Sequence, residues 1–539
     1  MSSFLDKFFL KIEKIKIDLG TGIAFFFIIV FFRFLLESLL ALGPANGFLP
    51  ISSLLHYLFW YGVSFLFSSL IVSWFSQRPI DFVLKLILIF YPFILFPLLF
   101  PLILGESVKL SVSYLYAGDF KTIFNTFLNF FENSNFSLSL RLQIFLSLLA
   151  LVIFVYWSTK KWWRALMAAV ISYFLLILAG SLPSFLIIFQ NPQKLYPLPS
   201  LLDLFFHHQK EILIAKGYFS YLSSYNFNVW LDLVLASLLF PLLILALGLV
   251  VFFWKKDLVG VIFKNLRLRK GFDFFLTALL GGGVGIYLFS WYPSFSFINL
   301  IALINLFLTA ILFYGATAFF DDIFDKEVDI LAHPSRPLVS GKISEKSSLR
   351  IAVSLAALSL MGAMSVSFHL FLFVLASLFL AFLYSAPPFR LKRFFLINTF
   401  LVALAFLFFA WGGFFWIFPE KNILDIPLGF IGFYLLVMMI LVSLKDLSDF
   451  QGDQVGVIKT LPVVAGLQTA KLILGGALGL LVFLSFLFLS GNDFFLKVWG
   501  LIFGGSLFGL TVRKNFSEKV LYKAAVFFLG VVIFYLIIR

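Results

Sequence analysis

Apolar residues occur along this chain in long segments that are almost free of charge, and most of these segments reach about 20 residues. A helix needs about 20 apolar residues to cross a bilayer, whereas the strands of a membrane barrel alternate in character over about ten residues. The pattern therefore predicts an all-α, polytopic membrane protein with about 15 transmembrane helices. Six spans are expected first, at residues 22–42, 54–75, 83–104, 142–158, 165–189 and 229–254. Nine follow, at residues 272–291, 298–320, 350–367, 369–386, 395–416, 427–444, 469–490, 496–512 and 521–538.

A basic segment separates the two groups of spans. Six Lys and Arg residues fall between Lys255 and Lys270. Domain boundaries tend to fall in exposed polar linkers. We therefore predict an N-terminal six-span membrane domain of unknown function at residues 1–265. A C-terminal nine-span domain would occupy residues 266–539.

Composition and charge narrow the class of protein further. The chain is 62% hydrophobic, 12% charged and carries a net charge of +14. In a soluble protein this charge would suggest nucleic acid, but here the Lys and Arg residues fall in short loops, where they set topology. We expect a multi-pass integral membrane protein that contacts lipid, with no nucleic-acid partner and with its N-terminus in the cytoplasm. The sequence contains no Cys, which excludes disulfides and thiolate catalysis by this chain.

Two clusters of aspartates interrupt this apolar pattern, and they share the same spacing. In each cluster three aspartates are three and then four positions apart, at 322, 325 and 329 in the first and at 446, 449 and 453 in the second. On a helix such a spacing places the carboxylates on one face. Crowded carboxylates raise one another's pKa unless a cation lies among them, and Mg²⁺ prefers oxygen ligands together with substrate phosphates. We therefore predict a metal-binding role, with two Mg²⁺ ions, for Asp321, Asp322, Asp325 and Asp329 in the first motif and Asp446, Asp449 and Asp453 in the second.

A basic residue follows each acidic cluster. Arg336 comes after the first motif and Lys459 after the second. Either side chain could hold phosphate oxygens by charge-assisted hydrogen bonds. Both clusters fall at span ends, in loops that the positive-inside rule places in the cytoplasm. Two such clusters facing each other would hold a diphosphate.

At these residues the chain resembles the UbiA superfamily of intramembrane prenyltransferases. The first cluster matches the motif N-D-x-x-D-x-x-x-D, with Asp321 in place of the usual Asn, and R-P-L-x-S-G follows at Arg336–Gly341. The second cluster matches D-x-x-D-x-x-x-D. Between them, residues 384–393 (YSAPPFRLKR) are similar to the family segment Y-S-x-P-P-x-R-L-K-R. Asp321 keeps an oxygen ligand and adds a negative charge.

The resemblance implies a function for residues 266–539. A nine-helix bundle of the UbiA type would transfer a polyprenyl group, at the cytoplasmic side of the membrane, from a prenyl diphosphate to a small-molecule or lipid acceptor. The catalytic residues would be Arg336, Tyr384 and Lys392. The diphosphate would be bound by Arg336, Ser385, Lys392 and Lys459. The acceptor stays open between an aromatic compound, a lipid glycerol phosphate and a phosphosugar.

The main alternative is a multi-span transporter of cations or lipids that uses the aspartates as a cation site. Transporter sites tend to lie near the bilayer midplane between repeats, whereas these aspartates lie at span ends beside cations suited to phosphate. The enzyme is therefore the preferred interpretation.

Two further features of the apolar spans need an account. Arg33 and Glu37 lie in the middle of the first span, where unpaired charges are costly, and their i, i+4 spacing predicts an ion pair. A polar functional site in the first half is the alternative.

Four glycines gather inside the span at 272–291, and we interpret them as sites of close helix packing rather than as a nucleotide loop: Gly281, Gly282, Gly283 and Gly285.

Overall fold

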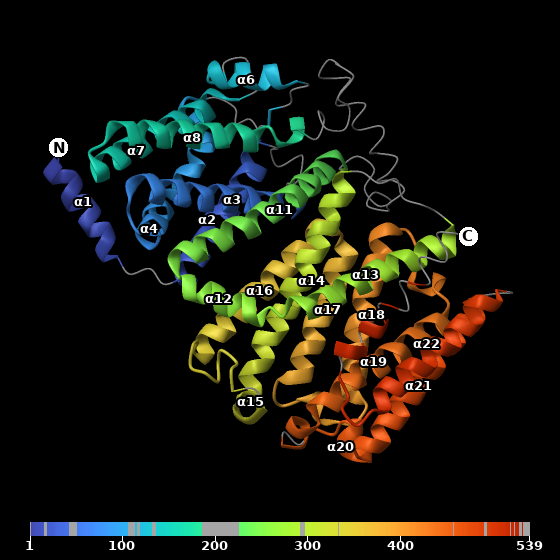
Figure 1. Ribbon diagram of the computed structural model, residues 1–539. Coiled ribbons are helices and arrows are strands. Elements are labelled where there is room, and N and C mark those ends of the chain that lie inside the picture. Colours follow the sequence, from blue (N-terminus) through green and yellow to red (C-terminus); the bar gives the residue numbers. More distant parts are fainter. Residues whose placement is uncertain are drawn as a thin grey trace. The chain divides into compact units, whose positions relative to one another are not determined.

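The computed structural model is all-helical in the part of the chain that it describes (Figure 1). The described residues are 2–15, 19–41, 51–105, 114–115, 119–131, 136–185, 226–290, 297–332, 334–455, 458–489, 493–517, 519–521, 523–525, 527 and 531. Within them, fourteen helical segments are long and apolar enough to cross a membrane. The predicted all-α membrane fold is confirmed. The expected last span, 521–538, falls mostly outside the described residues.

The chain forms two compact units, each of which is described by itself. The first comprises Met1–Ile262 and Ser294–Asn305, and the second comprises Phe263–Pro293 and Leu306–Arg539. The first change of unit lies inside a helix, α12 (Lys256–Asn265), so the basic segment is helical rather than an extended linker. The division into domains at residues 265 and 266 stays a prediction.

The N-terminal unit is organised around α3 (Ile51–Ser76), which packs against the helices on either side of it in the sequence and against α11. The helices of this unit are α1 (Ser2–Lys14), α2 (Leu19–Ala41), α3, α4 (Ile80–Phe90), η1 (Tyr91–Leu95), α5 (Phe96–Ile103), α6 (Phe120–Leu128), α7 (Leu138–Thr159), α8 (Trp162–Gly180) and α11 (Asn226–Trp254). Its interior holds polar groups as well as Phe and Leu side chains. The buried Arg33 and Glu37 lie 3.7 Å apart, which confirms the predicted ion pair. His56 Nδ1 lies 2.9 Å from Asp232 Oδ1 in the same interior.

The C-terminal unit is a bundle in which helices adjacent in sequence mostly pack against each other. Its helices are α13 (Leu268–Phe289), the part of α14 (Phe297–Phe324) from Leu306 onward, α15 (Lys326–Ala332), α16 (Glu345–Val366), α17 (Phe368–Ser385), η2 (Leu391–Arg393), α18 (Ile397–Ile417), η3 (Ile423–Asp425), α19 (Leu428–Val455), α20 (Leu461–Ala465), α21 (Leu467–Leu489) and α22 (Phe494–Val512). Helices α13 and α18 form an extensive contact (Figure 1). Aromatic rings fill it, and the Phe274 and Phe406 rings stack with centroids 4.0 Å apart.

Glycines bring the α13 and α18 backbones into contact. A Cβ atom placed on Gly281 would lie 1.8 Å from the Ala410 carbonyl oxygen, and one placed on Gly413 would lie 1.8 Å from the Ala278 carbonyl oxygen. Gly282 and Gly285 are also closely covered by side chains, whereas Gly283 has open space. The close-packing interpretation is therefore confirmed at three of the four glycines.

Both helices that carry the acidic motifs extend further than the apolar pattern predicts. The span expected at 298–320 is α14, which continues to Phe324, and the span expected at 427–444 is α19, which continues to Val455. Backbone hydrogen bonding continues through the aspartates, with Asp325 N donating to Asp321 O at 3.0 Å. The apolar pattern marks where a helix leaves the hydrocarbon region, but backbone hydrogen bonding can continue beyond that point.

The glycine contact predicts a position-specific loss of stability. Gly281→Ala should lower the free energy of unfolding by about 1–3 kcal/mol, because the added methyl group meets a backbone carbonyl that cannot rotate away. Gly283→Ala is the matched control, since a methyl group there meets nothing within 4 Å. Thermal unfolding of both variants in detergent, followed by tryptophan fluorescence, makes the comparison. Equal unfolding temperatures would contradict the packing argument.

Candidate active site

The first acidic motif lies where α14 ends and α15 begins. Asp321 and Asp322 occupy the last turn of α14, Asp325 lies at the bend, and Asp329 belongs to α15. A hydrogen bond from Asp329 N to Asp325 O, 2.8 Å long, keeps the second turn in register with the first. The helical spacing thus holds across the bend. The expectation that this motif lies in a loop is wrong, because its residues are helical on both sides of Asp325. Asp322 and Asp329 are also buried.

Lys392 lies between two of these carboxylates. Its Nζ atom is 2.7 Å from Asp321 Oδ1 and 2.6 Å from Asp325 Oδ1, and the residue is 2% exposed. Ser385 Oγ donates a hydrogen bond of 2.6 Å to the same Asp321 oxygen. Arg390 Nη2 donates to Asp325 Oδ1 at 3.2 Å. The YSAPPFRLKR segment therefore supplies the counter-charges for this half of the motif.

Arg336 neutralises the other half of the motif. Its Nη1 atom donates to Asp322 Oδ1 at 3.0 Å and also to Asp329 Oδ2. Asp322 accepts two further hydrogen bonds, from Asn265 Nδ2 at 2.9 Å and from Arg267 Nη2 at 3.0 Å. Both Asp322 oxygens are thus engaged, and this aspartate fastens the loop after α15 to the start of α13.

Asn265 and Arg267 contact the candidate site through Asp322, and the sequence pattern did not predict this. They lie at the end of α12 and just before α13, within the basic segment that we interpreted as a linker. Arg267 has a positive φ of 45°, an uncommon conformation for a residue with a side chain. The signal in the sequence was an amide and a guanidinium close before the first span of the bundle. It could not be distinguished from the basic residues that set topology.

Burial shifts the titration of the carboxylates that lie outside the membrane spans. The pKa of Asp329 is raised to about 6, chiefly by burial and further by the charge of Asp322, against the opposing effect of Arg336. The pKa of Asp325 is raised by burial and by the neighbouring Asp321, whereas the Lys392 ammonium lowers it. The crowding expected from the spacing is therefore present, and Lys and Arg side chains moderate it.

The second motif lies on one continuous helix, α19, as its spacing predicts. Asp449 Oδ2 pairs with Lys445 Nζ at 3.0 Å, and Asp453 Oδ2 accepts a hydrogen bond of 3.1 Å from Thr460 Oγ1. Asp446 Oδ2 is buried and has no hydrogen-bond partner among the described residues. Fewer basic side chains therefore pair with the aspartates of this motif than with those of the first one.

The two motifs are neighbours. Helix α15 packs against α19, and Lys459 N donates to Arg393 O at 3.3 Å. The Tyr384 hydroxyl lies within electrostatic range of four aspartates drawn from both motifs, which are Asp321, Asp325, Asp446 and Asp453. The structure therefore brings together most of the candidate residues. The Lys459 side chain is exposed, and only the backbone N–H of this residue is described in contact with the site segment, at Arg393 O.

The donor set fits a divalent cation that phosphate oxygens would complete. Every candidate ligand is a carboxylate oxygen, the type that Mg²⁺ prefers, and Mg²⁺ usually takes one or two carboxylates plus substrate phosphates. The buried Asp446 Oδ2 atom can accept a hydrogen bond or bind a cation. Among the residues that the structure describes, no three acidic or His side chains converge as a complete metal cage. The site thus suits a metal that is shared with a phosphorylated ligand.

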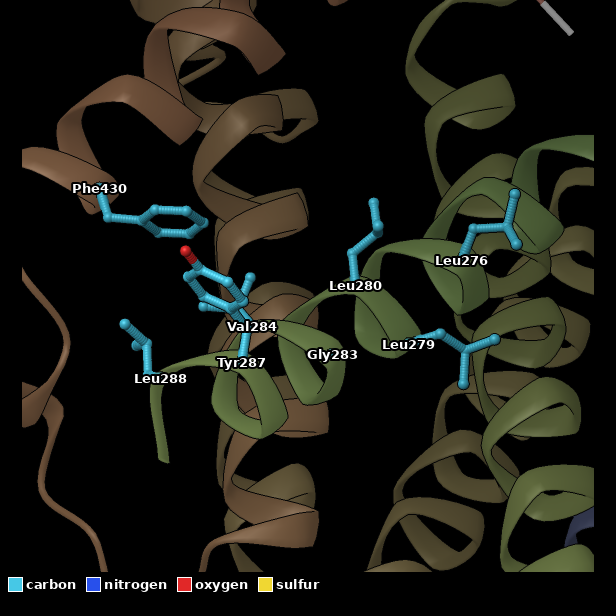
Figure 2. Close-up of a pocket in the computed structure, with 8 residues that line it drawn as sticks. All are labelled: Leu276, Leu279, Leu280, Gly283, Val284, Tyr287, Leu288 and Phe430. Carbon is cyan, nitrogen blue, oxygen red and sulfur yellow. The ribbon is translucent and has the colours of Figure 1, made fainter. Parts of the chain in front are cut away.

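An apolar cavity of about 520 Å³ lies along α13 and extends to α19 (Figure 2). Phe430 is its lining residue from α19, and it precedes Asp446 by about four helical turns. The other lining residues, all on α13, are Leu276, Leu279, Leu280, Gly283, Val284, Tyr287 and Leu288. The cavity is therefore well separated from the carboxylates, although it lies along a helix that carries one motif.

Comparison with known proteins identifies the family. Residues 274–535 match the model of the UbiA prenyltransferase family. The C-terminal half of this chain is a UbiA family domain. The resemblance seen in its motifs is thereby confirmed. The match begins after Asn265 and Arg267, so two of the residues that hold Asp322 precede the UbiA match.

Curated relatives of the UbiA domain include proteins named for different products. A chloroplastic chlorophyll synthase from Oryza sativa is 27% identical over 213 residues, which is 37% of this chain and 53% of the relative. A digeranylgeranylglyceryl phosphate synthase from Thermococcus sibiricus is 30% identical over 159 residues, or 28% of this chain and 52% of the relative. This chain thus spans about half the length of the curated relatives it matches.

Solved structures are also similar to this chain. A UbiA homolog from Archaeoglobus fulgidus bound to DMAPP and Mg²⁺ aligns with 21% identity and a TM-score of 0.40, covering 50% of this chain and 95% of that one. The same homolog bound to GPP and Mg²⁺ aligns with 22% identity and a TM-score of 0.40, covering 50% and 97%.

The contacts of Asp322 predict that it stabilises the fold more than Asp449 does. Asp322 is 3% exposed, so Asp322→Ala would remove the carboxylate that pairs with Arg267 and leave Arg336 with Asp329 alone, at a cost of about 3–5 kcal/mol. Asp449→Ala removes a 33% exposed carboxylate that pairs with an exposed lysine, at a cost of about 1 kcal/mol or less. Unfolding temperatures of the two variants in the same detergent test the order. An Asp449→Ala variant as unstable as Asp322→Ala would contradict it.

Proposed function

We propose that the C-terminal unit is a Mg²⁺-dependent prenyltransferase, which moves a polyprenyl group from a prenyl diphosphate to a small-molecule or lipid acceptor. The observation that carries this proposal is the convergence of two aspartate motifs with Lys392, Arg336 and Tyr384 in a UbiA domain. Oxygen ligands and basic side chains at one site are the complement of a metal–diphosphate group. Two Mg²⁺ ions, one at each motif, would share the diphosphate.

The chain's own groups would act on the leaving group. The aspartates would hold Mg²⁺, which would neutralise negative charge on the diphosphate. Lys392 and Arg336 would donate hydrogen bonds to the phosphate oxygens as the bond to the first prenyl carbon breaks. Ser385 and Lys459 would add donors at the edges of the diphosphate. These contacts strengthen as negative charge grows on the leaving oxygen, so they favour the transition state over the ground state.

Tyr384 would face the prenyl cation that remains. Its ring already lies beside a cation, since Lys392 Nζ is 5.8 Å from the ring centroid. An aromatic face attracts positive charge at such distances. The acceptor nucleophile then bonds to the first prenyl carbon and loses its proton, and diphosphate is the second product. The prenyl tail would extend along α19, away from Asp446 and toward the cavity at Phe430.

The acceptor is proposed by class, as an aromatic compound, a lipid glycerol phosphate or a phosphosugar. The relatives are named for different products, so the family alone leaves the class open. We propose no role in bond breaking for the N-terminal unit, and assign it to acceptor choice, lipid access or assembly. The reaction would take place at the cytoplasmic side of the membrane.

The central prediction is that transfer requires both motifs and a divalent metal. Asp325→Ala and Asp449→Ala should each lower kcat by about a hundredfold or more, because each removes a charge that positions the diphosphate. The assay combines full-length protein, Mg²⁺, labelled geranylgeranyl diphosphate and a pool of acceptors, with products identified by mass. Glu345→Ala is the control, an exposed carboxylate near the first motif that pairs with Lys326. Full activity of Asp325→Ala in EDTA would refute the proposal.

The proposed orientation can be tested with single cysteines, since the chain contains none. Lys342 is exposed and follows the first motif, so a cysteine there should react with a membrane-permeant maleimide but not with an impermeant one in intact cells. Both reagents should label it after the membrane is opened. Labelling of intact cells by the impermeant reagent would place the acidic motifs on the outer face instead.

A further inference from the structure

We propose that Lys392 is a counter-cation of the first motif that a divalent metal displaces, and that the displaced ammonium then binds the diphosphate. The inference rests on the proposed function and adds an order of binding to it. Lys392 would hold the motif together before the metal arrives and serve the substrate afterwards. The acceptor and the N-terminal unit play no part in it.

The geometry of Lys392 resembles that of a bound cation. Its Nζ atom lies 2.7 Å from Asp321 Oδ1 and 2.6 Å from Asp325 Oδ1, and the side chain is buried. A Mg²⁺ ion bound by the same two oxygens would lie about 2.1 Å from each. Such an ion would come close to the ammonium, and two positive charges at that separation repel strongly. The metal and the ammonium therefore exclude each other between these two carboxylates.

The two halves of the motif are neutralised in different ways. Asp322 and Asp329 are held by Arg336, and Asp322 is also held by Arg267 and Asn265. Planar guanidinium groups form fixed, multiple hydrogen bonds, whereas an ammonium on a flexible four-carbon stem can move between partners. Arg390 also donates to Asp325, at 3.2 Å, but Lys392 is the cation that bridges Asp321 and Asp325. The Asp321–Asp325 half thus has the exchangeable cation, and the Asp322–Asp329 half keeps its position while the exchange occurs.

Asp321 makes Lys392 a stronger competitor in this chain. The family motif has Asn at this position, and a neutral amide would leave the ammonium with one carboxylate rather than two. With Asp321 present, Lys392 bridges two negative charges and Ser385 fixes the shared oxygen. When a metal takes both carboxylates, the ammonium loses both partners, and phosphate oxygens are the anions available at the site.

The test measures Mn²⁺ binding by electron paramagnetic resonance on full-length protein in lipid nanodiscs, without diphosphate. Lys392→Met should bind Mn²⁺ about tenfold or more tightly than the natural protein, because it removes the competitor and leaves the oxygens in place. Lys392→Arg keeps the charge and should not show this gain. Lys326→Met is the matched control, a lysine whose partner is the exposed Glu345, and its affinity should be unchanged.

A second measurement, of geranylgeranyl diphosphate binding, should show the opposite effect of Lys392→Met on affinity. In the presence of Mn²⁺, Lys392→Met should bind this diphosphate more weakly than the natural protein, since the displaced ammonium is missing. A merely structural role for Lys392 would lower both affinities together. The exchange is overturned if the natural protein binds both Mn²⁺ and the diphosphate but Lys392→Met binds Mn²⁺ equally or more weakly. The proposed function stands in that case.

A folding defect in Lys392→Met would not end the test. Lys392→Gln keeps a hydrogen-bond donor for one carboxylate. It should therefore increase the affinity for Mn²⁺ less than Lys392→Met does. An unchanged affinity would again overturn the exchange. Size-exclusion profiles and unfolding temperatures identify the variants that are folded. Failure of the natural protein to bind Mn²⁺ with or without the diphosphate would instead overturn the proposed function, and the exchange with it.

Discussion

Buried carboxylates need positive charge close by, and the C-terminal unit is arranged to satisfy this requirement. Four aspartates at the α14–α15 junction have basic partners from three separate segments, at the start of α13, after α15 and at η2. Removing a charge from water costs several kcal/mol unless hydrogen bonds and a counter-charge replace the hydration. The positions of these segments are therefore coupled through the motif. A bundle that formed without these pairs would leave like charges facing one another in a region of low dielectric.

The same requirement explains the contrast between the two motifs. The first is neutralised by side chains that come from distant parts of the sequence. The second keeps a buried Asp446 oxygen without a hydrogen-bond partner among the described residues. The protein's own side chains thus neutralise most of the first motif, and the second keeps one buried oxygen available for a donor or a cation. This asymmetry suits a site that must be folded in advance and still bind a charged ligand tightly.

Much of this structure could be predicted from the sequence, because its strongest signals are local. Long apolar runs predicted most of the spans to within a few residues, although α8 ends at Gly180 and not at the expected residue 189. The i, i+4 spacing of Arg33 and Glu37 predicted their pairing. The extensions of α14 and α19 were missed because hydropathy reports the surroundings of side chains, whereas backbone hydrogen bonds continue into the polar region. The contacts of Asn265 and Arg267 with Asp322 join residues more than fifty positions apart, and no local pattern encodes such a pairing.

The attachment of Asp322 to Asn265 and Arg267 has a consequence for protein engineering. The UbiA match begins at residue 274, and a chimera joined at that point would retain all seven aspartates. It would lose two of the three side chains described as donors to Asp322, and Arg336 alone would hold this buried anion. A fusion point chosen from family boundaries would thus leave an acidic motif that is complete in sequence and poorly supported in space. A transplanted module that keeps all three of these donors must therefore include Asn265 and Arg267 as well as the family match.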